Sequence, residues 1–83
     1  MEFIEEKNRI YVEQDGRRVA EIIFEKKDDK TYVITNTFVD EAHRGEGIGS
    51  KLVSRAVNKI KKEGYNVEAT CSYAKAWLEK HEK

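Results

Sequence analysis

Residues 39–52 have the sequence Val39-Asp40-Glu41-Ala42-His43-Arg44-Gly45-Glu46-Gly47-Ile48-Gly49-Ser50-Lys51-Leu52, and this stretch decides the fold. The residues before it, Thr31 to Val39, are rich in β-branched and aromatic side chains, which is typical of a strand. Within the stretch, three glycines let the backbone turn tightly and approach a ligand closely. The sequence therefore predicts a strand, a tight glycine loop and a new element that begins near residue 48.

A helix over residues 48–63 is predicted after the loop, because the apolar residues change to helical spacing there. These residues are Ile48, Leu52, Val53, Ala56, Val57 and Ile60. They recur about one turn apart and form the buried face of an amphipathic helix. Gly64 stands where a glycine commonly ends a helix.

The chain then returns to a strand and ends in a second helix. Residues 65–71 alternate apolar and polar side chains, as a short strand does. Ser72 is a suitable N-cap for a helix with an inner face of Ala74, Trp77, Leu78 and His81. Strand, helix and strand in about 40 residues form a βαβ crossover, so its two strands are expected to lie parallel.

The first half of the chain is predicted to be an antiparallel meander. Its strands are residues 8–14, 17–27 and 31–39. Asp15-Gly16, between the first two, is a strong signal for a tight hairpin turn. The predicted fold is α/β (α+β): a mixed, mostly antiparallel sheet of about four strands, with a βαβ crossover and a C-terminal helix, in a single domain over residues 1–83.

The composition excludes several classes of protein. Sixteen basic and sixteen acidic residues cancel in 83, so no nucleic-acid partner is predicted. No apolar run approaches the roughly 20 residues of a membrane span. The chain starts with acidic residues where a secretory signal would be basic. The single Cys71 cannot form an internal disulfide, which fits a cytoplasmic protein. Too few possible ligands accompany Cys71 for a zinc site, so we expect no metal. We expect either a monomer or a weak homodimer.

The glycine loop has the features of a phosphate-binding site. The first N–H groups of a helix lack internal partners and lie at the positive end of the helix dipole, and Arg44 adds a fixed charge. A P-loop needs Lys followed by Ser or Thr after its last glycine, but Ser50-Lys51 has the reverse order. A dinucleotide loop needs GxGxxG, whereas Gly45, Gly47 and Gly49 give GxGxG. The remaining pattern is R-x-x-G-x-G, formed by Arg44, Gly47 and Gly49.

This pattern resembles the acetyl-CoA motif of the GNAT acetyltransferase superfamily. Three segments carry the resemblance: Asn36-Thr37-Phe38-Val39, the loop 39–52, and Ala69-Thr70-Cys71-Ser72-Tyr73. Together they resemble its minimal, single-cysteine branch, described as YjdJ-like. The specific motifs cover the half of the chain from Asn36 onward, and the element order agrees over nearly all of it.

The resemblance implies how acetyl-CoA would bind. In the superfamily, the strand before the loop carries a bulge and diverges from the strand after the helix. The pantetheine arm enters that split and bonds to backbone near Phe38 and Val39. The pyrophosphate lies on the amides of Gly45, Glu46, Gly47, Ile48, Gly49 and Ser50, and the thioester lies near Cys71. Full-sized relatives have further helices and strands that shape the acceptor site, so here that site is open or completed by another chain.

Two positions depart from the branch pattern. Branch members usually have His-Thr where this chain has Asn36-Thr37. Asn36 cannot serve as a general base near neutral pH, so we do not expect the role of that histidine to carry over to this chain. Relatives often carry Pro at the position of Ala69, a difference that affects the stiffness of the strand end rather than the chemistry.

Cys71 and Tyr73 are the candidate catalytic residues, and each has a structural alternative. Cys71 is either a small buried apolar residue or a thiolate favoured by the following helix N-terminus. Tyr73 either packs on Trp77 one turn later, which we favour, or protonates the departing CoA thiolate, as tyrosines do in many relatives.

Other polar residues have simpler interpretations. We expect His43 and the strand residues Glu21 and Glu25 to be solvated rather than catalytic. Thr37 is explained by its place on a strand, and the alternative is that its hydroxyl touches the substrate. The helix residues Lys51, Arg55 and Lys59 form a solvated face, from which Lys51 or Arg55 is able to reach the 3′-phosphate of CoA.

The functional hypothesis is an N-acetyltransferase that moves acetyl from acetyl-CoA to an unidentified amine, directly or through Cys71. The alternative is a non-catalytic CoA-binding or protein-interaction module, because no general base is evident. A thiol redox sensor is less well supported, because the chain offers no second cysteine to resolve an oxidised Cys71.

Overall fold

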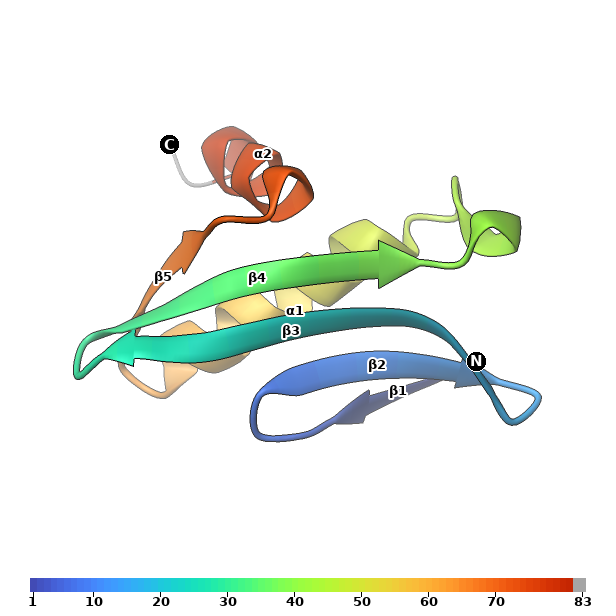
Figure 1. The fold of residues 1–83 in the computed structure, drawn as a ribbon, viewed down its shortest axis with the longest axis horizontal. Coiled ribbons are helices and arrows are strands. Elements are labelled where there is room, and N and C mark those ends of the chain that lie inside the picture. The colour runs from blue at the N-terminus through green and yellow to red at the C-terminus, as the bar shows by residue number, and fades with distance from the viewer. Residues whose placement is uncertain (82–83) are drawn as a thin grey trace.

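The computed structural model describes residues 1–81, in which one sheet and two α-helices form a two-layer fold (Figure 1). In chain order the elements are β1 (Glu2–Glu5), β2 (Arg9–Gln14), β3 (Arg17–Asp28), β4 (Thr31–Val39), the 3-10 helix η1 (Glu41–His43), α1 (Ile48–Lys62), β5 (Asn66–Ala69) and α2 (Ser72–His81). The strand order in the sheet is β1-β2-β3-β4-β5. The first four strands are antiparallel neighbours, and β5 is parallel to β4. The predicted mixed sheet with a βαβ crossover is therefore confirmed.

The local turn and helix signals act as the sequence predicts. Asp15 and Gly16 have φ angles of 54° and 75°, so both central residues of the β2–β3 turn are left-handed. That conformation suits the twist of a two-residue hairpin. Helix α1 ends at Lys62, and Gly64 follows with a φ of 93°. The N–H of Tyr65 then donates to the carbonyl of Ile60 at 3.1 Å and closes the helix end.

The core lies between α1 and one face of the sheet (Figure 1). Its largest fully buried side chains are Phe24, Ile10, Ile22, Ile34, Leu52, Ile60, Val12, Val19 and Val53. The strand members alternate with exposed or half-buried residues, and the helix members share one face of α1. This packing fixes the N-terminus of α1 against the far end of β4.

The sheet splits beyond Ile34. Strand β5 pairs with β4 only from Thr31 to Ile34, and its last partner is Ala69. Strand β4 continues to Val39 without β5 beside it. The β3–β4 register shifts between Ile23 and Phe24, which face Asn36 and Ile34, so Thr35 is the extra residue of a bulge. The bulge and the divergence that the family resemblance implied are both present.

Some elements differ from the prediction. The sheet has five strands within residues 1–81, because Glu2–Glu5 pairs with β2 and adds a strand at the edge. Its Phe3 and Ile4 stand alone among acidic residues, so no periodic pattern revealed it. The 3-10 helix η1 was also missed. None of the helices between residues 1 and 81 has the length and apolar character needed to cross a membrane.

Helix α2 begins one residue away from its predicted cap. The carbonyl of Cys71 accepts the N–H of Lys75 at 2.9 Å, which is the first bond of the helix. Cys71 is therefore the N-cap, and Ser72 is the first helical residue. On the inner face, Ala74 is buried, Trp77 and Leu78 are half-buried, and His81 is exposed, so the predicted stripe is one residue too long.

Candidate functional site

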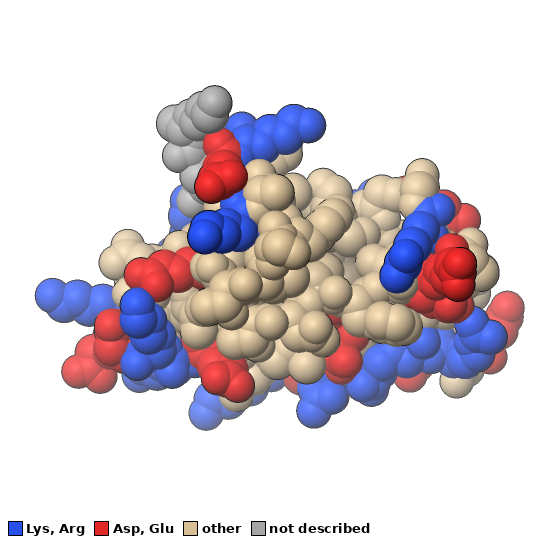
Figure 2. All heavy atoms as spheres, turned by 45° about the horizontal axis from the view of Figure 1, so that its top comes forward, with Lys and Arg blue, Asp and Glu red and all other residues tan. Residues whose placement is uncertain are grey.

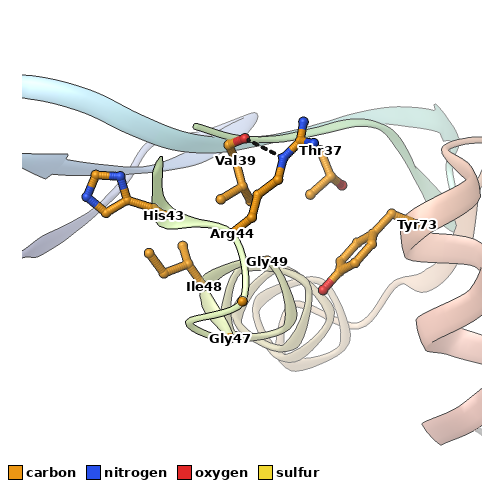
Figure 3. A pocket seen from close by; sticks show the side chains of 9 residues that line it. Thr37, Val39, His43, Arg44, Gly47, Ile48, Gly49 and Tyr73 are labelled. Carbon is orange, nitrogen blue, oxygen red and sulfur yellow. Dashed lines mark hydrogen bonds between the residues drawn. The ribbon is translucent and has the colours of Figure 1, made fainter. Parts of the chain in front are cut away.

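A cavity of about 510 Å³ lies where the end of β4, the loop and the starts of both α-helices meet (Figure 3). It is lined by Thr37, Val39, His43, Arg44, Gly45, Gly47, Ile48, Gly49 and Tyr73. The fold thus brings together seven of the predicted site residues: Val39, Arg44, Gly45, Gly47, Ile48, Gly49 and Tyr73. Phe38, Glu46, Ser50 and Cys71 are not part of the wall. Thr37 and His43 also belong to the wall, although the sequence favoured a structural role for Thr37 and a solvated position for His43.

The glycine loop meets the cavity with left-handed backbone. Gly45 and Gly47 have φ angles of 88° and 79°, and a Cβ at either position would meet only open space. Glycine is therefore needed there for its backbone conformation and not for room. Gly47 is the N-cap of α1, it provides no side-chain cap, and the first turn contains no acidic residue. The first backbone N–H groups of α1 therefore have no side-chain acceptor and can donate hydrogen bonds to an anion.

Gly49 is required for a different reason. It is buried in the first turn of α1, and a Cβ on it would lie 2.8 Å from the hydroxyl oxygen of Tyr73. In Figure 3 the Tyr73 side chain points from α2 toward this turn. This contact of Tyr73 with Gly49 is one that the expected packing on Trp77 did not include. Trp77 instead stacks on His81, with ring centroids 4.3 Å apart, and donates its indole N–H to Ser50 Oγ at 3.0 Å.

Arg44 leans across the cavity toward β4 (Figure 3). Its Nε donates a long hydrogen bond of 3.4 Å to the carbonyl of Val39, and its side chain is exposed. A guanidinium has five N–H donors in a fixed fork, so one weak bond leaves most of them available. Arg44 is therefore placed to contact an anion at the α1 N-terminus.

Cys71 lies beside the cavity and contacts it through Thr37. The Sγ atom is 3.5 Å from Thr37 Oγ1, and the residue is half-buried. Burial raises the pKa of the thiol. Hydrogen bonds from the Thr37 hydroxyl and from the backbone N–H groups of Ala74 and Tyr73 lower the pKa by more, so the net result is below the ordinary value. As N-cap of α2, the sulfur takes the place of a capping oxygen.

His43 is not the solvated residue that the sequence suggested. Its side chain is only 18% exposed, and its Nδ1 is 3.6 Å from Asp40 Oδ2. Its Nε2 is 2.6 Å from Gln14 Oε1, and Asp40 also pairs with Arg17. Gln14 and Arg17 belong to the β2–β3 hairpin, whereas Asp40 directly precedes η1, so the cluster fastens η1 to the sheet. Sequence reasoning missed the cluster because Gln14 and Arg17 are distant from His43 along the chain.

Of the two strand carboxylates, only Glu25 is solvated. The Glu21 side chain is 16% exposed and pairs with Arg9 at 3.2 Å and Arg18 at 2.9 Å. Both ion pairs hold Glu21 on the sheet, so it is not the solvated side chain that the sequence suggested. Lys51 and Arg55 are exposed as expected, whereas Lys59 is half-buried and pairs with Glu63 at 3.1 Å.

The fold is that of a known enzyme class. A family model described as GCN5-related N-acetyl-transferase matches residues 8–83. The chain belongs to the GCN5-related N-acetyltransferase (GNAT) family, whose enzymes use acetyl-CoA. The comparison supports the superfamily, and the YjdJ-like branch remains a prediction.

Solved structures of other proteins are similar to this chain. A GCN5-like protein from Staphylococcus aureus, solved by NMR, has 29% identity and a TM-score of 0.80 over 98% of this chain and 80% of that one. An IAA acetyltransferase from Bacillus cereus has 28% identity and a TM-score of 0.70 over 87% of this chain and 51% of that one. A GNAT acetyltransferase from Elizabethkingia anophelis, with acetyl-CoA bound, shares the fold at 23% identity and a TM-score of 0.62, over 69% of this chain and 37% of that one. Among curated proteins there is no significant match.

Proposed function

We propose that the protein binds acetyl-CoA at the N-terminus of α1 and transfers the acetyl group to an amine. One observation carries the proposal: the uncapped first turn of α1 opens into the 510 Å³ cavity between two left-handed glycines and Arg44. A pyrophosphate there would accept hydrogen bonds from the amides of residues 45–50 and a charge-assisted bond from Arg44. The family assignment supports acetyl-CoA as the source of that pyrophosphate.

The split in the sheet offers a path for the pantetheine arm. Beyond Ile34, one edge of β4 has no neighbouring strand, so its backbone N–H and C=O groups are open to a ligand. Pantetheine contains two amide groups, which pair with such an edge as a strand does. In this arrangement the arm passes Val39 and Phe38 and brings the thioester toward Thr37 and Cys71.

In the direct reaction, the amine nitrogen attacks the thioester carbonyl and a tetrahedral oxyanion forms. A backbone N–H near Val39 is the proposed donor to that oxyanion. The intermediate collapses, the carbon–sulfur bond breaks, and the CoA thiolate leaves while the amine proton passes to water. The Tyr73 hydroxyl, which lines the cavity, is the proposed proton donor to the thiolate.

The alternative route passes through Cys71. Its thiolate attacks the thioester carbonyl, the CoA thiolate leaves, and an acetyl-cysteine remains. The amine then attacks that second thioester, Cys71 thiolate leaves, and the amine proton again passes to water. The lowered pKa of Cys71 and its contact with Thr37 at the cavity wall support this route. Its absence from the wall itself supports the direct one.

One experiment tests the activity and separates the routes. The protein is incubated with acetyl-CoA and a panel of amines, CoA release is followed, and the protein is quenched rapidly for intact-mass spectrometry. CoA release that depends on an amine supports transfer. An acetyl adduct that is lost in Cys71→Ala supports the cysteine route. Turnover that is unchanged in Cys71→Ala, without an adduct, supports direct attack.

A non-catalytic CoA-binding module is the second candidate. The observation in its favour is that no carboxylate of the described residues 1–81 lines the cavity, and the wall histidine, His43, is engaged with Gln14. An amine would then have to arrive already neutral. Binding of CoA with no turnover for any amine, tested at a pH above the pKa of each amine, would favour this candidate over the enzyme.

A further inference from the structure

The end of β4 separates two sides of the sheet. Thr37 and Val39 line the main cavity. Their partners on β3, Ile22 and Ala20, are fully buried in the core that α1 covers. Side chains alternate along a strand, so Phe38, between the two cavity residues, points to the opposite side. In Figure 1, α1 crosses behind β3 and β4 and leaves the face toward the viewer uncovered. A ligand in the main cavity therefore leaves this second side of β4 open.

Uncharged side chains surround Phe38 on that open side. We call them the Phe38 patch and define it by Ile23, Asn36 and Phe38. In the β3–β4 register, Asn36 pairs with Ile23, and Phe38 pairs with Glu21 two residues earlier on β3, so all of them share one face. Phe38 is 47% exposed, and its ring is one of the few large apolar groups on the surface of residues 1–81. The patch thus presents an aromatic ring beside the unpaired edge of β4.

The carboxylate opposite Phe38 is already paired. Glu21 accepts hydrogen bonds from Arg9 at 3.2 Å and from Arg18 at 2.9 Å. Glu25, the next carboxylate on this face of β3, stands four residues further, about 13 Å along the strand. A positively charged amine at Phe38 would therefore lose water without gaining an ion pair of its own. The attraction between a cation and one exposed ring is smaller than that loss.

The reaction adds a second requirement. An amine nitrogen attacks a carbonyl with its lone pair, so it must be uncharged when it reacts. An amine like the lysine side chain, with an ordinary pKa of about 10.4, is uncharged in only about one molecule in 2,500 at pH 7. An amine bonded directly to an aromatic ring shares its lone pair with the ring and is uncharged at that pH. Such an amine needs no partner for a charge, and its flat ring packs well on another ring.

We propose that the acceptor is an aromatic amine, whose ring packs on Phe38 while its nitrogen reaches the thioester through the split beside β4. The proposal rests on the acetyl transfer proposed above. The two substrates then approach β4 from opposite sides: acetyl-CoA from the cavity, and the amine from the Phe38 patch. A nitrogen–carbon bond forms, the carbon–sulfur bond of the thioester breaks, and the sulfur leaves as a thiolate. The amine proton passes to water, and the product is an N-aryl acetamide.

The first test compares three small amines in steady-state assays of CoA release at pH 7. Aniline and benzylamine both have an aromatic ring, but only benzylamine is positively charged. The KM for aniline should be at least about tenfold lower, because only the small uncharged fraction of benzylamine binds. As the pH rises, the KM for benzylamine should fall toward that for aniline, whose own KM stays constant. Methoxyamine is uncharged but has no ring, so it should bind more weakly than aniline.

The second test removes the ring from the protein. Phe38→Ala should raise the KM for aniline about fivefold. It should leave the KM for acetyl-CoA unchanged, because pantetheine is proposed to pair with the backbone of β4 and not with this ring. Phe38→Tyr should keep the low KM for aniline. Tyr11→Ala is the matched control, since Tyr11 is an aromatic residue on the same face, on the far side of Glu21. Thermal unfolding verifies that each variant is folded.

An NMR measurement adds a readout that needs no turnover. Aniline added to the CoA complex should shift the amide signals of Ile23, Asn36 and Phe38. A KM for benzylamine at pH 7 equal to or below that for aniline, or a KM for aniline that is unchanged in Phe38→Ala, would overturn the proposal. Turnover of basic amines alone would remove the aromatic acceptor and keep the transferase. CoA release with none of the amines would remove the proposed transfer, and the aromatic acceptor with it.

Discussion

The hydroxyl of Tyr73 packs against Gly49, so closely that a Cβ atom on residue 49 would lie 2.8 Å from the hydroxyl oxygen. This contact joins the first turn of α1 to the first turn of α2 at the wall of the cavity. It explains the third glycine of the motif, which has an ordinary helical conformation and gains nothing from a left-handed backbone. Gly45 and Gly47 are therefore needed for their left-handed backbone, and Gly49 is needed because a larger residue would collide with Tyr73.

Gly49→Ala tests that contact. Alanine in a helix is about 1 kcal/mol more favourable than glycine, so the variant should remain folded with little change in its free energy of unfolding. The Tyr73 ring must move, so we expect a severalfold loss of CoA affinity. Tyr73→Ala made in the same chain should cost less than the two separate losses together, as a double-mutant cycle would reveal. Strict additivity would show that the two residues do not interact.

Gly47→Ala tests the backbone requirement. With a φ of 79° and no atom near an added Cβ, the substitution introduces strain without a clash. We expect it to lower the free energy of unfolding by about 1 kcal/mol, the ordinary cost of a left-handed alanine. Gly47→Asn should cost less, because asparagine tolerates this conformation better. Chemical denaturation measures both. If alanine and asparagine cost nothing, the left-handed turn is not a feature of the protein in solution.

The thiol of Cys71 should titrate below an ordinary cysteine. Burial raises its pKa, but Thr37 and the first amides of α2 lower it by more. The rate of alkylation by iodoacetamide, measured against pH, should therefore have its midpoint below the usual value of about 8.5. Thr37→Val removes one donor and should move the midpoint upward. A wild-type midpoint at or above the usual value would contradict the lowered pKa of Cys71.

The same shift has a consequence for stability. A pKa that is lower in the folded state stabilises the fold when the thiol is ionised. The contribution is therefore complete above the ordinary thiol pKa and is lost as the pH falls through the lowered one. The difference in free energy of unfolding between wild type and Cys71→Ala should grow as the pH rises through that window. A difference that is flat with pH would argue against the shift.

His43 should hold the loop in place. Its ring is mostly buried and bonded to Gln14, so His43→Ala is expected to lower the free energy of unfolding by about 1 kcal/mol and to weaken CoA binding. Glu41→Gln, an exposed side chain in η1 itself, is the control and should change neither quantity. If the two variants have the same unfolding free energy and the same CoA affinity, the contact between His43 and Gln14 does not stabilise the CoA site.

The parts of the fold that could be predicted are those with local causes. The hairpin at Asp15-Gly16, the apolar face of α1 and the glycine loop each follow from the preferences of neighbouring residues. Strand β1 and the burial of His43 follow instead from partners brought together by the fold, and no local pattern reports such partners. The N-cap was misplaced by one residue because serine is the better capping residue, and the sulfur of Cys71 nevertheless occupies that position.

In the candidate site, too, the residues of one contiguous segment could be predicted, and contacts between distant segments could not. Arg44, Gly45, Gly47 and Gly49 were predicted and lie at the cavity, since the loop that carries them is contiguous. Cys71 contacts the cavity only through Thr37, a relation across two strands that spacing does not reveal. Figure 2 shows an uncharged surface in the middle of one face, with charged side chains around it. This surface forms only when the chain folds, so no single segment of the sequence predicts it.

The central claim is that the start of α1 binds the pyrophosphate of acetyl-CoA. The most direct measurement is an NMR titration of the amide signals with acetyl-CoA. We expect saturable shifts concentrated at residues 44–50, with smaller shifts along β4 near Phe38 and Val39. If those signals stay in place at acetyl-CoA concentrations up to the millimolar range, or if the shifts fall elsewhere on the molecule, the account is contradicted.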